Sequence, residues 1–292
     1  MLPSVLPILF AGASALIWGT ADFCGGKAVQ QGNPADRGQA LSVTVFSQLS
    51  AVPMIALFLV LVPGRFGVSA LIWGGLAGVA GLFGIVLLYQ GLSSGAMAIV
   101  APTTAVMAAV VPLIGGLLMG ERPGAAAMVG AVFAVIAIGL VSLGPSGTTG
   151  AVTLRVIGLA LLAGALFGVF FILLRQAGDA SGMWPLAAAR FVGLPLGLLL
   201  LRPMGGSLRL GAGPNGKRAV GFAVIAGVLD ITANAAFLWA AYRGDISVIA
   251  PVASLYPAST VLLALAIDRE RLRAIQVAGL GVAAAALVLA AS

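Results

Sequence analysis

Long apolar runs separated by short polar turns divide the chain into ten segments. A helix needs about 20 apolar residues to cross the hydrocarbon core of a bilayer. Turn-forming clusters such as Gly32-Asn33-Pro34 mark the breaks. The pattern predicts an all-α integral membrane protein with ten transmembrane helices. Their expected ranges are roughly 5–25, 39–62, 68–92, 97–119, 123–143, 155–176, 183–201, 218–242, 247–267 and 272–291.

The chain also matches itself when it is shifted by 149 residues without a gap. The superposed pairs include Trp18 and Phe167, Gly78 and Gly227, Gly95 and Gly244, Pro102 and Pro251, Glu121 and Glu270, and Gly130 and Gly279. We predict two five-helix units, 1–148 and 149–292. Because each unit crosses the membrane an odd number of times, the second must be inverted. This arrangement is typical of secondary transporters, with a site near mid-bilayer between the halves.

Composition supports a lipid-facing surface and excludes several kinds of chemistry. Apolar residues make up 61% of the chain and charged residues only 8%, whereas soluble proteins carry roughly a quarter charged residues. Histidine is absent and there is a single cysteine, so imidazole metal sites, histidine-based nucleophiles and internal disulfides are excluded. We therefore expect no metal, no cofactor and no enzymatic activity.

Basic residues give an orientation for the predicted helices. The net charge is +7, but the Lys and Arg residues stand singly between apolar runs and form no basic stripe, so no nucleic-acid partner is expected. The side with the odd-numbered connections carries ten of them, and the side with both termini carries four. Because cytoplasmic loops are enriched in Lys and Arg, we expect both termini outside.

Several motifs resemble a known family. They are Trp18-Gly19, the run from Tyr89 through Gly95 into Ala101-Pro102, Gly120-Glu121-Arg122 with Gly130, and a weaker second set at Gly244, Ala250-Pro251, Glu270-Arg271 and Gly279. Over essentially the whole chain they resemble the drug/metabolite transporter superfamily, in its EamA-type ten-helix branch. The chain is most similar there to bacterial exporters of amino acids, including aromatic ones. The resemblance implies a multi-pass protein of a bacterial-type inner membrane.

Charged residues at depth are the first candidates for a site, because they are costly in lipid unless they meet a cavity or a partner. Asp230 lies about twelve residues into the eighth segment, and Asn234 follows one turn later on the same face. Arg190 lies at a similar depth in the seventh segment and is a candidate ion-pair partner of Asp230, for a structural or a functional reason. The repeat equivalents are Leu41 and Gly81, so one half alone would carry the pair.

Asp22 lies about seventeen residues into the first segment, close to its predicted end. We interpret it as a solvated interfacial residue, with proton antiport as the alternative. Glu121 and Glu270 precede the fifth and tenth segments. We interpret them as charges that stabilise the N-termini of those helices.

Prolines interrupt the fourth and ninth segments at matching positions. Each proline frees the carbonyl four residues earlier, which must then face protein or a wet cavity. We interpret Pro102 and Pro251, with Pro112 and Pro257 further along, as kinks that act in gating, although proline is also common in membrane helices. Aromatic and polar side chains near the kinks would line an amphiphilic pocket. The predicted substrate-binding residues are Trp18, Tyr89, Gln90, Thr103, Thr104, Met107, Asp230, Asn234, Trp239, Ser254 and Tyr256.

These features predict a monomeric inner-membrane secondary transporter that works by alternating access. Its substrate would be a small amphiphilic metabolite, with export of amino acids favoured, enclosed by the first, third, fourth, sixth, eighth and ninth segments. One alternative is broad efflux of hydrophobic drugs, which a purely apolar pocket would favour. The alternative from another class is an intramembrane enzyme.

Overall fold

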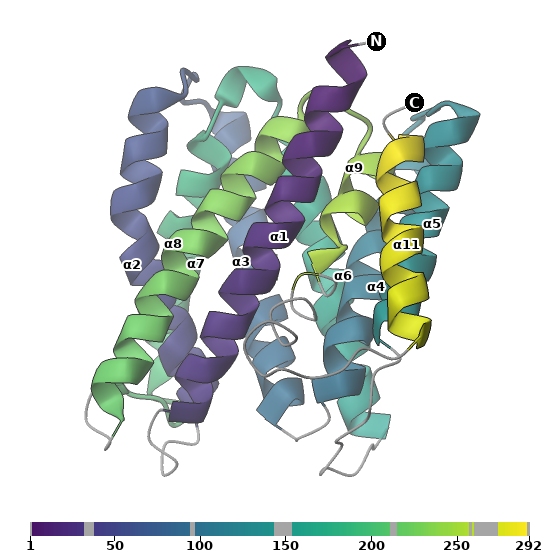
Figure 1. The fold of residues 1–292 in the computed structure, drawn as a ribbon. Coiled ribbons are helices and arrows are strands. Elements are labelled where there is room, and N and C mark those ends of the chain that lie inside the picture. The colour runs from purple at the N-terminus through teal and green to yellow at the C-terminus, as the bar shows by residue number, and fades with distance from the viewer. Residues whose placement is uncertain are drawn as a thin grey trace.

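A computed structural model describes residues 2–31, 38–93, 97–142, 154–210, 215–256, 259 and 274–290. The regular elements in these ranges are all helices, and they form one bundle (Figure 1). They are α1 (Leu2–Gln31), α2 (Gln39–Leu61), α3 (Val68–Ser93), α4 (Met97–Leu118), α5 (Ala125–Ser142), α6 (Leu154–Gln176), the 3-10 turn η1 (Asp179–Ser181), α7 (Trp184–Leu201), α8 (Gly216–Ala241), α9 (Ile246–Ala253) and α11 (Ala274–Ala290).

Two helices differ from their predicted ranges. The first was expected to end near residue 25, but α1 continues to Gln31. It does so because its last turns are packed: Ala28 is fully buried in a cluster with residues of α2 and α8. A helix tolerates glycine, at a cost of about 1 kcal/mol, where packing compensates for it. Helix α9 ends at Ala253, and most of the rest of the predicted segment 247–267 lies outside the described residues.

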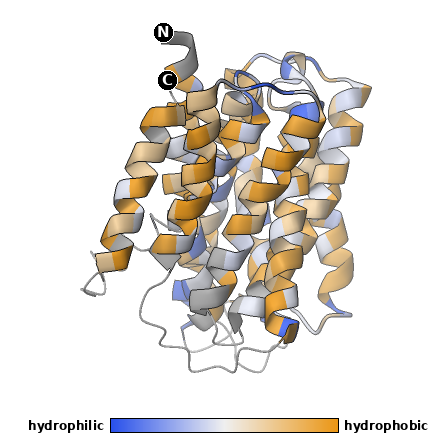
Figure 2. Cartoon of the chain, turned by 90° about the vertical axis from the view of Figure 1, so that its right-hand side faces the viewer, coloured by the Kyte–Doolittle hydropathy of each residue, from blue (hydrophilic) through white to orange (hydrophobic). Residues whose placement is uncertain are grey.

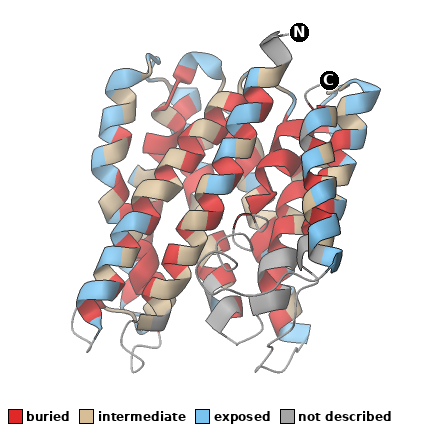
Figure 3. Ribbon diagram, in the orientation of Figure 1, coloured by how far each residue is buried: buried red, intermediate tan, exposed pale blue. Residues whose placement is uncertain are grey.

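The bundle turns its apolar side chains outward as well as inward, which confirms an integral membrane protein. Six of the described helices are long and apolar enough to span a bilayer. Large apolar residues such as Leu9, Val60 and Leu118 lie exposed on the outside, and orange helix surfaces cover the bundle in Figure 2. Buried positions lie on the inner faces (Figure 3) and are largely alanine, so the helices approach closely.

The two halves interlock through equivalent helix pairs. Helix α1 packs against α8, as α6 packs against α3, and α2 packs against α8, as α7 packs against α3. Exchanging the halves therefore reproduces the packing. Two inverted five-helix repeats thus form one body, and their helices alternate around a common centre.

Glycine contacts correct the predicted repeat alignment of α2 with its equivalent helix α7. Gly78 lies so close to α7 that an added Cβ would be 2.3 Å from the carbonyl oxygen of Ala189. Its equivalent Gly227 is as close to α2, with an added Cβ 2.0 Å from the carbonyl oxygen of Ser47. Ala189 thus corresponds to Ser47. The counterpart of Arg190 is the next residue, Gln48, and not Leu41 as the ungapped comparison predicted.

Glu121 joins two connections at one end of the bundle. It was expected to stabilise the start of α5, but its carboxylate accepts hydrogen bonds from the amides of Ile246 and Ser247, both at 2.9 Å. It therefore caps α9, because the connection after α4 folds back beneath the first turn of that helix. Glu270 and Arg271 lie outside the described residues.

Candidate functional site

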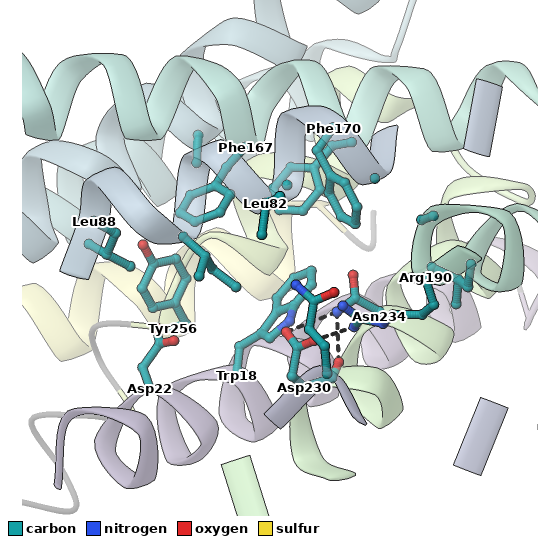
Figure 4. A pocket seen from close by; sticks show the side chains of 18 residues that line it. Trp18, Asp22, Leu82, Leu88, Phe167, Phe170, Arg190, Asp230, Asn234 and Tyr256 are labelled. Atoms are coloured by element: carbon teal, nitrogen blue, oxygen red, sulfur yellow. Dashed lines mark hydrogen bonds and ion pairs between the residues drawn. The ribbon is translucent and has the colours of Figure 1, made fainter. Parts of the chain in front are cut away.

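A cavity lies between the interlocked halves, and we call it the central cavity (Figure 4). Its wall comes mainly from α1, α3, α6, α7 and α8, with single residues from α2, from α4 and from the segment after α9. The contributions of α2 and α7 were not expected. The lining residues are Trp18, Asp22, Gln48, Gly78, Gly81, Leu82, Ile85, Leu88, Ala108, Phe167, Phe170, Phe171, Leu186, Ala189, Arg190, Asp230, Asn234 and Tyr256.

An ion pair crosses this cavity between α7 and α8. The Nη2 atom of Arg190 donates to Oδ2 of Asp230 at 2.5 Å. Helices α7 and α8 each pack against α2, so the pair bridges the space between them. The side chains are 15% and 27% exposed, which leaves both accessible from the cavity.

Asn234 extends this polar group and carries an unsatisfied atom. Its Nδ2 donates to the backbone carbonyl of Asp230 at 2.7 Å and to Oδ1 of Asp230 at 3.0 Å. Because both of these partners are acceptors, the amide orientation is set by the network. Oδ1 of Asn234 is then buried without a hydrogen-bond partner among the described residues. Buried acceptors are rarely left unpaired, so this oxygen is an unsatisfied acceptor in the wall of the cavity.

Polarity divides the cavity into two walls. The polar wall consists of Trp18 and Asp22 on α1 with Asp230 and Asn234 on α8. The apolar wall consists of the lining residues of α3 and α6, and Figure 4 shows Leu82, Phe167 and Phe170 across the cavity from the polar wall. The apolar residues are Gly78, Gly81, Leu82, Ile85 and Leu88 on α3 and Phe167, Phe170 and Phe171 on α6.

The two walls are built from equivalent positions of the repeat. Shifting by 149 residues places Asp22 on Phe171, Asn234 on Ile85 and Asp230 on Gly81. Each pair lines the cavity, but only one member of each pair is polar. The backbone arrangement is therefore nearly symmetric while the chemistry is not. An amphiphilic molecule would have one preferred orientation in such a site.

Trp18 is held rigidly in the polar wall. Its ring is 5.4 Å from that of Phe171 and 5.6 Å from that of Phe237, and these two phenylalanine rings are 4.4 Å apart. Tilted aromatic contacts of this kind add to the stabilisation from burial alone. Trp18 is only 8% exposed, so it presents a fixed aromatic surface to the cavity.

Asp22 is the main correction to the sequence interpretation. It was expected at the membrane surface, but it lines the cavity one helical turn after Trp18. The reason is the extra length of α1, which places Asp22 within the helix instead of at its end. Among the residues that the structure describes, Asp22 forms no hydrogen bond or ion pair.

Four of the predicted substrate-binding residues meet at the cavity, Trp18, Asp230, Asn234 and Tyr256, together with the predicted ion-pair residue Arg190. The predicted binding residues of α4 do not join them, because α4 packs closely on α6. Thr104 is buried and donates to the carbonyl of Ala160 at 3.2 Å. Met107 lies against Gly164, and Thr103, although partly buried, is also outside the lining.

The remaining predicted binding residues lie elsewhere. Trp239 is five residues after Asn234, about 140° around the helix, and stacks on Phe10 with ring centres 4.3 Å apart. Gln90 is exposed near the end of α3, and Ser254 is buried outside the lining. The side chain of Tyr89 lies outside the described residues.

The prolines keep their predicted positions in the helices, but their gating role remains a prediction. Pro251 is buried inside α9. Pro112 is buried in α4 and packs against Gly168 of α6. Pro102 lies within α4, with its side chain outside the described residues, and Pro257 is outside them altogether.

A membrane-embedded bundle of two inverted repeats around an amphiphilic cavity is the architecture of a secondary transporter. In the described part of the chain, no cluster of three His, Cys, Asp or Glu side chains could hold a metal ion. A family model, the EamA-like transporter family, matches the chain twice, over residues 5–143 and 154–292. The chain therefore belongs to the EamA-like transporter family, and it transports small molecules across a membrane.

Structural comparison agrees with this assignment at the level of the fold. A crystal structure described only as that of a protein has a TM-score of 0.69 and 15% sequence identity to this chain. The match covers 97% of this chain and 96% of the other. A comparison with curated proteins finds none that matches. The predicted division at 148–149 falls between the two segments that the family model matches, outside the described residues.

Proposed function

We propose that this transporter exports small amphiphilic metabolites, with amino acids favoured, by alternating access through the central cavity. The observation that carries the proposal is the unpaired Oδ1 of Asn234 beside the Arg190–Asp230 pair. These groups face an aromatic wall across the cavity. A solute with a polar end and an apolar end satisfies both walls at once.

The donors and acceptors of the polar group suit a solute with a carboxylate. A guanidinium carries five N–H donors in a planar fork, and the contact with Asp230 uses one of them. The remaining donors can bind a second carboxylate, while Asn234 accepts a hydrogen bond from the solute. A purely hydrophobic drug would remove water from the partly exposed Arg190–Asp230 pair without replacing its hydrogen bonds. This difference favours a metabolite over broad drug efflux.

The proposed setting is a bacterial-type inner membrane with both termini outside. The excess of Lys and Arg in the odd-numbered connections supports this orientation. Both repeats of one chain line the cavity, so a single chain holds the two halves that alternating access requires, and we propose that it works as a monomer.

Purified protein in liposomes tests the proposal by counterflow. Labelled Phe, Met and Thr should exchange across the sealed bilayer and be recovered chemically unchanged, which also separates transport from enzymatic conversion. If all three fail to exchange while a lipophilic cation does, drug efflux replaces the proposal.

A pair of variants tests the role of the polar group. Asn234→Ala should raise KM for the exchanged amino acid about tenfold, because a tenfold change corresponds to about 1.4 kcal/mol, the size of one hydrogen bond. Thr232→Ala is the matched control: Thr232 lies on the same helix and donates to the carbonyl of Val228, away from the cavity lining. Equal effects of the two substitutions would contradict a role for Asn234 in binding.

A further inference from the structure

We propose that Asp22 is the cation-binding group of the central cavity and that it recognises the ammonium group of an amine-bearing solute. The inference rests on the proposed function and assigns a substrate class to the same cavity.

The charges in the wall point to a cationic ligand. Three of the lining residues are charged: Asp22, Arg190 and Asp230. Arg190 and Asp230 neutralise each other at 2.5 Å, so among the described lining residues one negative charge, on Asp22, has no positive partner. A carboxylate removed from water inside a membrane is unstable unless it takes up a proton or meets a positive partner. The described residues supply none, and a bound cation would.

The surroundings of Asp22 explain why a protein cation does not fill this role. On α8 the facing charged group is Asp230, which repels the Asp22 carboxylate, and on α7 Arg190 is held by Asp230. From the segment after α9, the lining residue near Asp22 is Tyr256, whose phenol carries no positive charge. On α1 itself, the Nζ atom of Lys27 lies 5.4 Å from the centre of the Phe23 ring.

The position of Asp22 suits an organic ammonium group. Trp18 precedes it by four residues on the same face of α1, a rise of about 6 Å, and Figure 4 shows Trp18 between Asp22 and the Arg190 group. An ammonium bound at Asp22 therefore lies beside an indole, which attracts cations through its ring face. The apolar part of the solute then meets the phenylalanines of α6.

Paired solutes that differ only in the amine test this assignment. Phenylalanine is compared with 3-phenyllactate, in which a hydroxyl replaces the ammonium, and 2-phenylethylamine with 2-phenylethanol. The wild-type transporter should prefer the amine in each pair. Asp22→Asn should lower kcat/KM for the amines about tenfold or more, because the charge that holds the ammonium group is lost. The hydroxyl compounds should change less than about twofold, since a change that small is well under 1 kcal/mol.

Two further variants separate recognition from folding. Asp22→Glu keeps the charge and should retain the preference for amines. Asp179→Asn removes an exposed carboxylate outside the cavity and should change nothing. An equal loss for both members of each pair in Asp22→Asn would overturn the proposal, because it would assign Asp22 to a coupling cation or to stability.

The second solute pair keeps the two proposals distinguishable. If the wild type exchanges 2-phenylethylamine but no amino acid, the amino-acid proposal fails and Asp22 is still tested by the carboxylate-free pair. If the wild type does not prefer the amine in either pair, the assignment of Asp22 is wrong even where amino acids are transported.

Discussion

Single polar side chains decide what this cavity can bind, because the rest of its wall is aliphatic and aromatic. Arg190 and Asp230 meet across the cavity instead of along a helix interface. Each carries its charge inside the membrane region, where water cannot fully solvate it. Each charge therefore depends on the other.

A double-mutant cycle should measure that dependence. Arg190→Gln leaves Asp230 charged and unpaired, and Asp230→Asn does the same to Arg190. Each single variant should therefore lower the melting temperature in detergent micelles more than the double variant does. The expected coupling is about 0.5–3 kcal/mol. The lower part of that range fits best, because both side chains remain partly accessible from the cavity. Additive losses would contradict the dependence.

The sequence predicted the residues of the site that are unusual for their surroundings and missed those that are not. Asp230, Asn234 and Arg190 stand out because polar groups are costly at mid-membrane depth. Phe167, Phe170 and Phe171 look like ordinary lipid-facing residues of an apolar helix. Asp22 and Gln48 lie in the wall because of the true length of α1 and the shifted register of α2, which no local pattern reveals. One signal was available: Asp22 is equivalent to Phe171 in the repeat, so placing one of them in the wall would have placed the other there too.

At the scale of elements, close glycine contacts set how the helices pack. Gly227 lies on the face of α8 that meets α2, whereas nothing lies within 4 Å of a Cβ added at Gly221 on the same helix. The two positions have the same intrinsic helix propensity and differ only in their neighbours.

Alanine at these two positions should act in opposite directions. Gly227→Ala forces α8 away from the backbone of Ser47 and should lower the melting temperature. Gly221→Ala adds helix propensity without a clash, worth about 0.8–1 kcal/mol in a helix interior, and should raise it or leave it unchanged. Thermal unfolding in the same detergent checks both. Stabilisation by Gly227→Ala would show that the helices are not in this contact.

Two carboxylates at the start of α9 should respond differently to neutralisation. Glu121→Gln removes the charge from two hydrogen bonds and should speed exchange of the amides of Ile246 and Ser247 with deuterium.

Burial, and then the nearby Glu121, raise the pKa of Asp245. The folded state therefore binds the Asp245 proton more tightly, and stability falls as pH rises from about 4. Asp245→Asn should remove that part of the pH dependence and leave the capping amides protected.

At the scale of the whole molecule, the sequence predicted the architecture well because the bilayer imposes strong rules. Apolar runs of sufficient length must be helices, since unpaired backbone groups are not tolerated in lipid. The repeat, with an odd number of spans in each copy, then predicted that the second copy is inverted. Helix packing was harder to foresee: α1 packs most extensively against α8, and α3 against α6. Apolar runs carry no signal for partner choice, which depends on individual glycine and alanine positions.

Accessibility labelling should show the inversion and the orientation. Cys24 is the single cysteine of the sequence and is buried. Replacing it with the small residue alanine gives a protein without cysteine, which a maleimide does not label. Gly67→Cys and Leu208→Cys then place probes in the connections after α2 and after α7, which are equivalent connections of the two repeats. On intact cells an impermeant maleimide should label the first, and the second only after permeabilisation. Labelling of both from one side would refute the inverted repeat.

The cross-pairing of helices also constrains how the protein is made. Helix α1 leaves the ribosome first, yet its main packing partner is synthesised about two hundred residues later. Until then its alanine-rich inner face and Asp22 have no permanent neighbour. The N-terminal half cannot reach its final packing while translation is under way, so assembly is completed by rearrangement of inserted helices after most of the polypeptide has emerged.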